Sequence, residues 1–364
     1  MTTDPRISKV EVHVQTVPTD LPEADGTSEW NAITLVLAEI FAGAETGLGY
    51  TYGSPAIGKV AEGLAETCLH GQSPFDIAFL HGRMARNIRN DGTRGLAAMA
   101  VSMLDVGLWD LKARLLGCSV ANLLGKARGA VPVYGSGGFT SYSPQQLEQQ
   151  FATWSEAGIR MVKMKVGADP SADPGRVKLA RNTVGENAEL FVDANGAYAA
   201  KQALKLAEFF HEQGVSWFEE PVSSDQLENL RFVRERVPAG MEIAAGEYAY
   251  TTFDFRRMLE AGAVDVLQAD ATRCGGFSGF LAAAHIAASF GCPVSSHCAP
   301  SLHMHAGCAV PGFRHLEYFH GHARIERMFF DGFIEQSNGY MTPDTSQPGL
   351  GLSFKLKDAQ RYAA

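Results

Sequence analysis

From residue 131 onward, the chain alternates between two hydrophobic patterns. Short apolar or β-branched runs predict buried strands, and the longer segments between them, with apolar residues every three or four positions, predict amphipathic helices. Eight strands are expected, at residues 131–136, 161–167, 189–195, 215–221, 241–247, 263–270, 293–297 and 315–319. Eight strands that alternate with seven helices predict an α/β fold, a (β/α) barrel whose last helix is missing or altered.

The first part of the chain follows a different pattern, in which strands come first and helices follow. The expected elements are a strand at residues 7–17, a hairpin at 31–52 and helices at 57–70, 76–90 and 94–116. This order predicts a small α+β domain at residues 1–130. A polar loop at residues 19–30 is expected between the first two strands, either as a plain connection or as a lid over a neighbouring site.

The length of the chain agrees with more than one structural unit, because 364 residues exceed what one hydrophobic core usually supports. The barrel is expected at residues 131–325. Residues 326–364 break the barrel rhythm, and we expect this C-terminal segment to pack back on the first domain.

Composition and charge narrow the class of protein. With 46% hydrophobic and 20% charged residues, the composition is that of a soluble globular protein. No apolar run of about 18 residues and no signal pattern occur, so we predict a cytoplasmic protein without a membrane partner. The net charge of −9 argues against a nucleic-acid partner. It does not argue against an anionic substrate, because a bound divalent cation can invert the local field.

Three acids end consecutive predicted strands. Asp193, Glu219 and Glu247 each follow an apolar run, at intervals of about one strand-helix unit. Because the carboxyl ends of barrel strands meet on one face, these side chains are expected to converge. Three carboxylates form a hard oxygen site suited to Mg²⁺. The alternative is three unrelated surface acids, which their common register makes the weaker interpretation.

Two lysines and a histidine-acid pair extend this set. Lys163 and Lys165 lie two positions apart, so both point to one face of their strand, and a lysine near a metal and another cation can act as a base. The alternative is a solvated edge strand. Asp270 and His297 end adjacent strands, where the carboxylate can fix the imidazole tautomer. Glu317 lies in the eighth strand and could donate to or accept from a bound carboxylate.

Other candidates carry weaker signals. His303 and His305 follow His297 closely and could indicate zinc, but packing or supporting roles are favoured and their roles stay open. The glycines of residues 272–279 resemble a phosphate-cradling turn without the flanking residues of a nucleotide loop. The six cysteines match no zinc spacing and are expected to be reduced, with Cys298 as a small buried hydrophobe.

At this point the sequence resembles the enolase superfamily, in its mandelate racemase subgroup. The resemblance covers nearly the whole chain. It is carried by VKMKVG, VDANG, WFEEP, GE at 246–247, QAD at 268–270, SSH at 295–297, LEYF at 316–319 and GLWDLKARLLG at 107–117. It implies a modified TIM barrel of the (β/α)7β type with an N-terminal capping domain, in which residues 19–30 match the specificity loop. It also implies a homo-oligomer, often an octamer.

The resemblance assigns a role to each candidate. Asp193, Glu219 and Glu247 would bind Mg²⁺, with Asn195 and Glu220 near the metal. Lys165 would be the base on one face of the substrate α-carbon, and His297, paired with Asp270, the base or acid on the other. Lys163 would neutralise the substrate carboxylate, and Glu317 would hydrogen-bond to it as charge accumulates.

The implied chemistry is removal of a proton α to a carboxylate, through an enediolate that the metal stabilises. Dehydration of a sugar acid is the favoured reaction, and racemisation or epimerisation of a 2-hydroxy acid is the alternative. A barrel that binds metal without turnover is a distant third possibility. Dipeptide epimerases and cycloisomerases of the superfamily carry a further lysine near the end of strand six. Residues 268–276 contain no lysine, which argues against those reactions.

Overall fold

The computed structural model describes residues 5–364 and begins with a three-stranded antiparallel sheet. The strands are β1 (Ile7–Ala24), β2 (Glu29–Ala42) and β3 (Glu45–Tyr52), in the order β1-β2-β3. The helices that follow are α1 (Ala56–Leu64) with a π-helix (Ala65–Leu69), α2 (Ile77–Asn87) with a 3-10 turn (Ile88–Asn90), α3 (Leu96–Leu115) and α4 (Val120–Leu124). The sheet lies directly against α3, since a β-carbon on Gly49 would be only 2.0 Å from the Met103 carbonyl oxygen.

The polar loop expected at residues 19–30 is not a loop, and this prediction is wrong. β1 and β2 continue through it as a hairpin arm, with a register shift between Pro18 and Glu23, and only residues 25–28 form the turn. Asp25 builds the turn by accepting hydrogen bonds from the backbone N–H groups of Thr27 (2.6 Å) and Ser28 (2.8 Å). A polar composition could not reveal this strand pair, because the arm extends beyond the hydrophobic core of its own domain.

The expected barrel is confirmed. Its parallel strands are β4 (Val131–Gly137), β5 (Met161–Lys165), β6 (Glu189–Asp193), β7 (Val215–Glu219), β8 (Glu242–Ala245), β9 (Val266–Ala269), β10 (Val294–Ser296) and β11 (Leu316–Phe319). The ladder runs in the order β10-β9-β8-β7-β6-β5-β4-β11. Residues before β11 close the ring, where the Arg314 N–H donates to the Val294 carbonyl at 2.7 Å.

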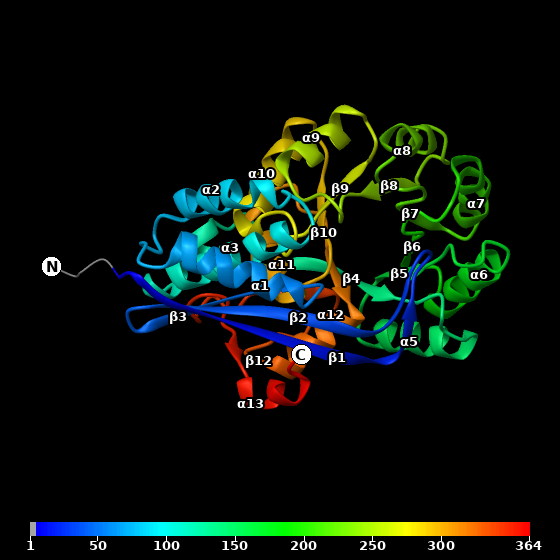
Figure 1. Cartoon of the computed structure of the whole chain (residues 1–364). Coiled ribbons are helices and arrows are strands. Elements are labelled where there is room, and N and C mark those ends of the chain that lie inside the picture. The colour runs from blue at the N-terminus through cyan, green and yellow to red at the C-terminus, as the bar shows by residue number, and fades with distance from the viewer. Residues whose placement is uncertain (1–4) are drawn as a thin grey trace.

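Helices surround this ring, as Figure 1 shows for the green to orange part of the chain. They are α5 (Pro144–Glu156), α6 (Asp173–Val184), α7 (Ala200–Glu212), α8 (Leu227–Arg234), α9 (Thr252–Glu260), α10 (Gly276–Ser289) and α11 (Pro300–Ala309). An eighth helix, α12 (His320–Phe329), follows β11, where we expected the last helix to be missing or altered. It is present and it faces the N-terminal sheet, because Tyr50 Oη donates to Glu326 Oε1 at 2.8 Å.

The barrel interior is filled by aromatic side chains below the carboxyl ends of the strands. Tyr134, Phe191 and Trp217 are buried, with ring centroids 5.6 Å apart between Tyr134 and Phe191 and 5.5 Å between Phe191 and Trp217. His315 lies against the same three rings. Packed rings therefore fill the barrel interior below the strand ends, and the polar side chains that could carry chemistry lie at its upper end.

The C-terminal segment runs back over the first domain. It contains β12 (Phe330–Asp331), β13 (Tyr340–Met341), β14 (Ser353–Phe354), α13 (Leu356–Ala359) and a 3-10 turn (Gln360–Tyr362). The Ala364 N–H donates to the Val14 carbonyl at 3.1 Å, and the Leu350 N–H donates to Asp110 Oδ1 at 2.6 Å. The division of the chain at residues 130 and 325 stays a prediction.

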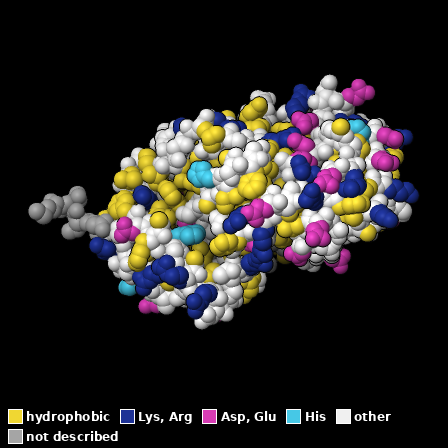
Figure 2. Space-filling view, turned by 90° about the horizontal axis from the view of Figure 1, so that it is seen from above, with side chains coloured by type: hydrophobic (Ala, Val, Ile, Leu, Met, Phe, Trp, Pro, Cys, Tyr) yellow, Lys and Arg dark blue, Asp and Glu magenta, His cyan; other side chains and the backbone are white. Residues whose placement is uncertain are grey.

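The surface seen from above carries acidic and basic side chains interspersed over the barrel half (Figure 2). Within residues 5–364, none of the helices is both long and apolar enough to cross a lipid bilayer.

Candidate active site

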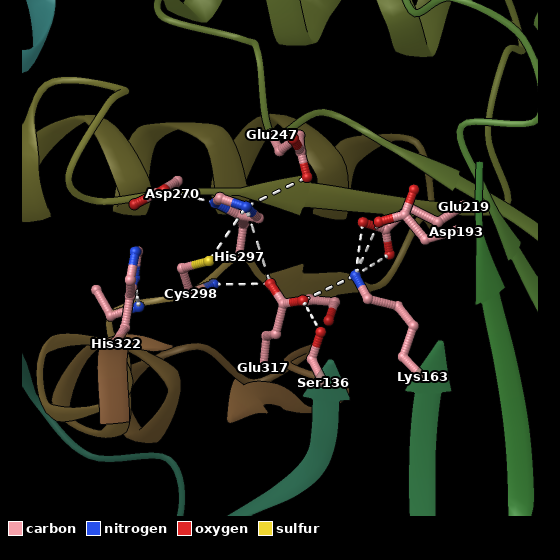
Figure 3. Close-up of polar contacts among 12 residues, drawn as sticks. Ser136, Lys163, Asp193, Glu219, Glu247, Asp270, His297, Cys298, Glu317 and His322 are labelled. Atoms are coloured by element: carbon pink, nitrogen blue, oxygen red, sulfur yellow. Dashed lines mark hydrogen bonds and ion pairs between the residues drawn. The ribbon is translucent and has the colours of Figure 1, made fainter. Parts of the chain in front are cut away.

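Three carboxylates meet at the upper end of the barrel. Asp193 and Glu219 are the last residues of β6 and β7 and are paired in register, and Glu247 lies two residues beyond β8. All three are buried, and each offers an oxygen within 4.8 Å of the others. Figure 3 shows them facing one another above the strand ends. The surface-acid alternative therefore fails, since surface acids would be exposed.

The electrostatics of this cluster fit a hard divalent cation. Burial, together with the neighbouring Asp193 carboxylate, raises the pKa of Glu219 to about 8. Oε2 of Glu247 is buried and accepts no aligned hydrogen bond, although His297 Nε2 lies 3.2 Å from it, so a lone pair remains to bind a cation. An all-oxygen set of three carboxylates is the donor set that Mg²⁺ prefers, and a cation relieves the repulsion among them. The residues present therefore fit the expected metal.

The two lysines point into this cluster from β5, which lies between β4 and β6 and is not an edge strand. Nζ of Lys163 lies 2.7 Å from both carboxylate oxygens of Glu219 and 2.8 Å from Glu317 Oε1. Nζ of Lys165 donates to Asp193 Oδ2 at 2.5 Å and to Asn195 Oδ1 at 3.1 Å. Burial alone would lower the pKa of Lys165, but the carboxylates of Asp193, Glu247 and Glu219, with Asp193 the strongest, together outweigh burial and raise this pKa above its ordinary value.

His297 approaches the carboxylates from the opposite end of the cluster. Its Nδ1 lies 2.7 Å from Asp270 Oδ2, and its Nε2 lies 3.2 Å from Glu247 Oε2. Burial would lower the pKa of His297, but Glu247 and the hydrogen bond to Asp270 raise it. In turn, His297 outweighs the effect of burial on Asp270 and lowers the pKa of that carboxyl. Asp270 thus orients the ring and leaves Nε2 facing the carboxylate cluster.

Glu317 lies between these two sides. Its Oε1 accepts from Ser136 Oγ at 2.6 Å, and its Oε2 accepts from the Cys298 N–H at 2.9 Å. Burial would raise the pKa of Glu317, but Lys163, His297 and Lys165, with Lys163 the strongest, together outweigh burial and lower this pKa well below its usual range. In this arrangement Glu317 is ionised and accepts hydrogen bonds from Ser136 and Cys298.

Asn195 and Glu220 each follow a carboxylate of the cluster and have unusual backbone angles. Their φ values are 45° and 37°, in the left-handed region that residues with a β-carbon rarely adopt. The Asn195 N–H donates to Asp193 Oδ1 at 2.9 Å, and Glu220 Oε1 is buried without a hydrogen bond. Both residues lie where the sequence placed them, beside the carboxylate cluster.

Sequence reasoning missed the contributions of Ser136 and Cys298. Ser136 lies at the end of the first barrel strand, so the strand-end rule that identified the acids could have found it. Sγ of Cys298 lies 3.2 Å from His297 Nε2, so this residue is more than a buried hydrophobe, although the sequence carries no signal for the contact.

An aromatic wall stands beside Cys298. Phe139, Tyr142 and Phe319 form a buried apolar cluster with Cys298, and Trp30 and Ile33 of the N-terminal sheet pack against it. The rings of Trp30 and Phe139 meet edge to face at 5.7 Å. The hairpin arm of the first domain therefore contributes to the surroundings of the barrel site.

The hairpin turn is docked on the barrel. The Thr140 N–H donates to the Ala24 carbonyl at 2.8 Å, and Thr140 Oγ1 donates to the Asp25 carbonyl at 2.7 Å. A β-carbon on Gly26 would lie 2.4 Å from the Ala194 carbonyl oxygen, so backbone meets backbone here. The lid role expected for residues 19–30 stays a prediction, now for a hairpin arm instead of a loop.

The weaker candidates do not form sites of their own. His303 and His305 bond to different backbone groups, Ala271 N and Ala121 N, and neither belongs to a cluster of potential metal ligands within residues 5–364. A β-carbon on Gly276 would meet the Asp105 carboxylate at 2.2 Å. A carboxylate thus occupies the place of an anion at the glycine turn, and these glycines serve the packing of α10 on α3.

Comparisons with known proteins agree with this geometry. A family model described as enolase C-terminal domain-like matches residues 146–359, and one described as the N-terminal domain of mandelate racemase / muconate lactonizing enzyme matches residues 9–125. The L-talarate/galactarate dehydratase of Salmonella typhimurium is 30% identical, covering 99% of this chain and 91% of that protein. The 3,6-anhydro-alpha-L-galactonate cycloisomerase of Streptomyces coelicolor is 31% identical, covering 85% and 86%.

Solved structures are similar over the whole chain. A mandelate racemase/muconate lactonizing enzyme-like protein from Rubrobacter xylanophilus superposes with a TM-score of 0.97 at 49% identity, covering 99% of this chain and all of that one. A racemase from Streptomyces coelicolor with bound magnesium gives 0.92 at 27%, covering 98% and 100%. The Salmonella dehydratase liganded with Mg and L-lyxarohydroxamate gives 0.91 at 27%, covering 100% and 94%.

Proposed function

We propose that this chain removes the α-proton of a sugar acid and dehydrates the acid, since it belongs to the mandelate racemase / muconate lactonizing enzyme family of the enolase superfamily. The observation that carries this proposal is the placement of Lys165 and His297. Lys165 contacts the carboxylate cluster at Asp193, and His297 contacts it at Glu247. A substrate held over the cluster by its carboxylate would therefore have a proton-transfer group on each side.

The metal assignment rests on the same cluster. Asp193, Glu219 and Glu247 are the residues that would hold Mg²⁺, for which their buried oxygens are suited. When bound, the ion supplies positive charge that fixes the substrate carboxylate and offsets the negative charge developing on it. Bound magnesium in two of the solved relatives supports this choice of ion.

The proposed dehydration transfers two protons, one on each side of the substrate. The contact that keeps Lys165 protonated would weaken once the Asp193 carboxylate binds a metal ion, so the amine of Lys165 would be neutral in the loaded site. The neutral amine takes the proton from the α-carbon, and the electron pair of the broken C–H bond moves toward the carboxylate. Lys163, close to both Glu219 and Glu317, provides fixed positive charge against this second negative charge. His297 then gives its proton to the β-hydroxyl, which leaves as water, and the resulting enol becomes a 2-keto acid. A hydrogen bond from Glu317 to the substrate carboxylate, for which Glu317 would first have to take up a proton, stays part of the proposal.

Racemisation or epimerisation of a 2-hydroxy acid is the second candidate. Proton groups on two faces allow removal on one side and return on the other, and the aromatic wall beside Cys298 would suit a less polar substrate. The similar racemase from Streptomyces coelicolor supports this alternative. Cycloisomerisation also stays open, because a named cycloisomerase is as similar to the chain as the dehydratase is, against the expectation from the missing lysine.

One screen separates these reactions. The protein is incubated with Mg²⁺ in D₂O with galactarate, L-talarate, gluconate, arabinonate, 3,6-anhydro-L-galactonate and both enantiomers of mandelate, followed by proton NMR and a 2-keto acid assay. Keto acid from an open-chain sugar acid supports the dehydratase, and deuterium exchange with inversion but no keto acid supports the racemase. Turnover of the anhydro sugar alone supports a cycloisomerase. No exchange with any compound would contradict the proposed function and favour a barrel that binds metal without turnover.

A further inference from the structure

His303 lies in the first turns of α11 and is completely buried between the segments that follow β9 and β10. Its Nδ1 lies 2.8 Å from the Cys298 carbonyl oxygen and 3.2 Å from that of Ala299. Its Nε2 accepts a hydrogen bond from the Ala271 N–H at 2.9 Å. One imidazole ring therefore joins the two segments, and both of its nitrogens are occupied.

These partners allow only one protonation state of the ring. A backbone N–H can only donate, so Nε2 must carry no proton toward Ala271, and a carbonyl can only accept, so Nδ1 must carry the proton toward Cys298. Burial also lowers the pKa of His303, which keeps the imidazole neutral. The ring is thus a neutral bridge of defined polarity and is not a proton-transfer group.

The two joined segments carry the acid/base pair of the site. Ala271 directly follows Asp270, and Cys298 directly follows His297. The Asp270–His297 hydrogen bond of 2.7 Å and the His303 bridge therefore tie the same two segments together side by side. A shift of either segment would stretch both connections.

The segment after His297 also needs such a restraint. Cys298 and Ala299 have φ values of 53° and 39°, in the left-handed region that favours glycine. The carbonyl oxygens of these two residues are the groups that His303 Nδ1 faces. Without the bridge, this strained pair could relax toward ordinary backbone angles and carry His297 away from Glu247.

We propose that His303 is a positioning residue for the His297 face of the active site. It fixes the separation and orientation of Asp270 and His297 by bridging the residues that follow them, and it leaves the Lys165 face untouched. This inference rests on the proposed function, since it presumes proton transfer by His297.

Two variants each break one half of the bridge. His303→Asn places an amide N–H near the position of Nδ1 and keeps the bond to Cys298, but it does not reach Ala271. His303→Gln places an amide oxygen near the position of Nε2 and keeps the bond to Ala271, but it loses the proton toward Cys298. The matched control is His305→Asn, since His305 is buried in the same helix and bonds instead to Ala121 N.

The readout is solvent deuterium exchange at the α-carbon, measured by proton NMR with Mg²⁺ on two probe pairs, D- with L-talarate and (R)- with (S)-mandelate. The members of each pair are enantiomers, so they present the α-proton to opposite faces. Exchange on the His297 face should fall roughly 10- to 100-fold in both His303 variants, since moving a reacting group by about 1 Å can slow a reaction by this factor. Exchange on the Lys165 face and KM should stay within about threefold of wild type. The control should lower neither face selectively.

Equal losses on both faces, or wild-type exchange on the His297 face, would overturn the proposal. Wild-type protein that neither exchanges a probe nor forms a keto acid in the screen counts against the proposed function, and this is seen before any variant is made. If neither His303 variant folds, neutron diffraction of the wild-type protein decides the matter. A deuteron on Nδ1 of His303 and none on Nε2 is the expected result, and a deuteron on Nε2 overturns the bridge.

Discussion

At the scale of single residues, buried lysines and buried carboxylates of the site neutralise one another. Lys163 and Lys165 face Asp193, Glu219 and Glu317 in a region shielded from water, where an unpaired charge is costly. Lys165 is held protonated by its contact with Asp193. The pairing explains how two lysines can be buried in a barrel strand, and it makes each proton-transfer group separately testable.

The two proposed proton-transfer groups, Lys165 and His297, should be separable by substitution. Lys165→Ala is expected to remove α-proton exchange on one face, and His297→Asn on the other, each by about 10²- to 10⁴-fold, the usual contribution of a positioned acid or base. Deuterium exchange with the two probe pairs measures both faces. The assignment is wrong if both variants retain full exchange.

Metal binding can be tested without substrate, through stability. Mg²⁺ at 100 times its Kd should stabilise the wild-type protein by about 2.7 kcal/mol, because a ligand that binds only the folded state shifts the unfolding equilibrium. Glu247→Gln removes one negative charge from the cluster, so thermal unfolding of this variant should show little of the stabilisation by Mg²⁺. In the wild-type protein, removal of Mg²⁺ with a chelator should abolish turnover.

The control for the metal experiment is Glu242→Gln. Glu242 begins β8, the strand that Glu247 follows, and its side chain pairs with Arg314 instead of the cluster. Its response to Mg²⁺ should match that of wild type. Equal responses of the Glu247 and Glu242 variants would argue against the metal assignment.

At the scale of elements, the β1–β2 hairpin arm connects the first domain to the barrel site. Its turn bonds to Thr140, and its Trp30 packs against the aromatic wall beside Cys298. Trp30 Nε1 donates to Glu23 Oε2 at 2.7 Å across the arm, which holds the two strands together where their register shifts. Movement of this arm would change the aromatic wall beside Cys298.

Displacing the arm should therefore affect substrate binding more than folding. Gly26→Ala places a β-carbon 2.4 Å from the Ala194 carbonyl oxygen, and two backbones cannot both stay in place at that distance. We expect KM for the substrate found in the screen to rise by roughly 10-fold, the cost of about 1.4 kcal/mol of lost contact, with a thermal midpoint close to wild type.

The matched control for the arm is Gly63→Ala in α1. A β-carbon on Gly63 meets no atom within 4 Å, so only the backbone effect of the substitution remains. The midpoint of the control should equal or exceed that of wild type, because alanine favours helix over glycine. An unchanged KM in Gly26→Ala would show that the arm takes no part in substrate binding.

At the scale of the whole molecule, Glu326 joins three parts of the chain. This buried side chain of α12 accepts hydrogen bonds from Tyr50 in β3 (2.8 Å) and from the Ser301 hydroxyl at the start of α11 (2.6 Å). Burial raises its pKa to about 7, although these hydrogen bonds act in the opposite direction. The junction between the N-terminal sheet and the barrel is therefore most stable when Glu326 is neutral.

The sign of the resulting pH dependence follows from linkage. Because the pKa of Glu326 is raised from 4.5 to about 7 on folding, its contribution to the free energy of unfolding is fully present below pH 4.5 and is lost as the pH rises through 7. Glu326→Gln mimics the neutral acid. Between pH 5 and pH 8, wild type should lose roughly 2 to 3 kcal/mol of stability relative to this variant.

Thermal and urea unfolding of both proteins at the two pH values measures this difference. Glu335→Gln is a suitable comparison, since Glu335 lies nearby on the surface and pairs with Arg327. Parallel pH profiles for wild type and Glu326→Gln would contradict the raised pKa of Glu326.

Sequence patterns alone predicted the barrel and the side chains that gather at its upper end. Apolar runs of strand length that end in Asp193, Glu219 and Glu247 specify both where a strand is buried and where it stops. In a parallel barrel every strand stops at the same end, so topology alone brings these acids together with Lys165 and His297. Patterns of this kind are local in the sequence, so they can be recognised without knowledge of any tertiary contact.

Only the tertiary structure decided which groups touch. The pairing of Lys163 with Glu317, the course of residues 19–30 as a docked hairpin arm and the bridge made by His303 join residues that are remote in sequence or separated by a turn. Tyr50 and Glu326 are 276 residues apart, and no periodicity links them. The physical reason is that the spacing of hydrophobic residues shows only which side of a helix or strand is buried. Hydrogen bonds between elements depend on distances, and those are set when the barrel closes and the first domain docks on it.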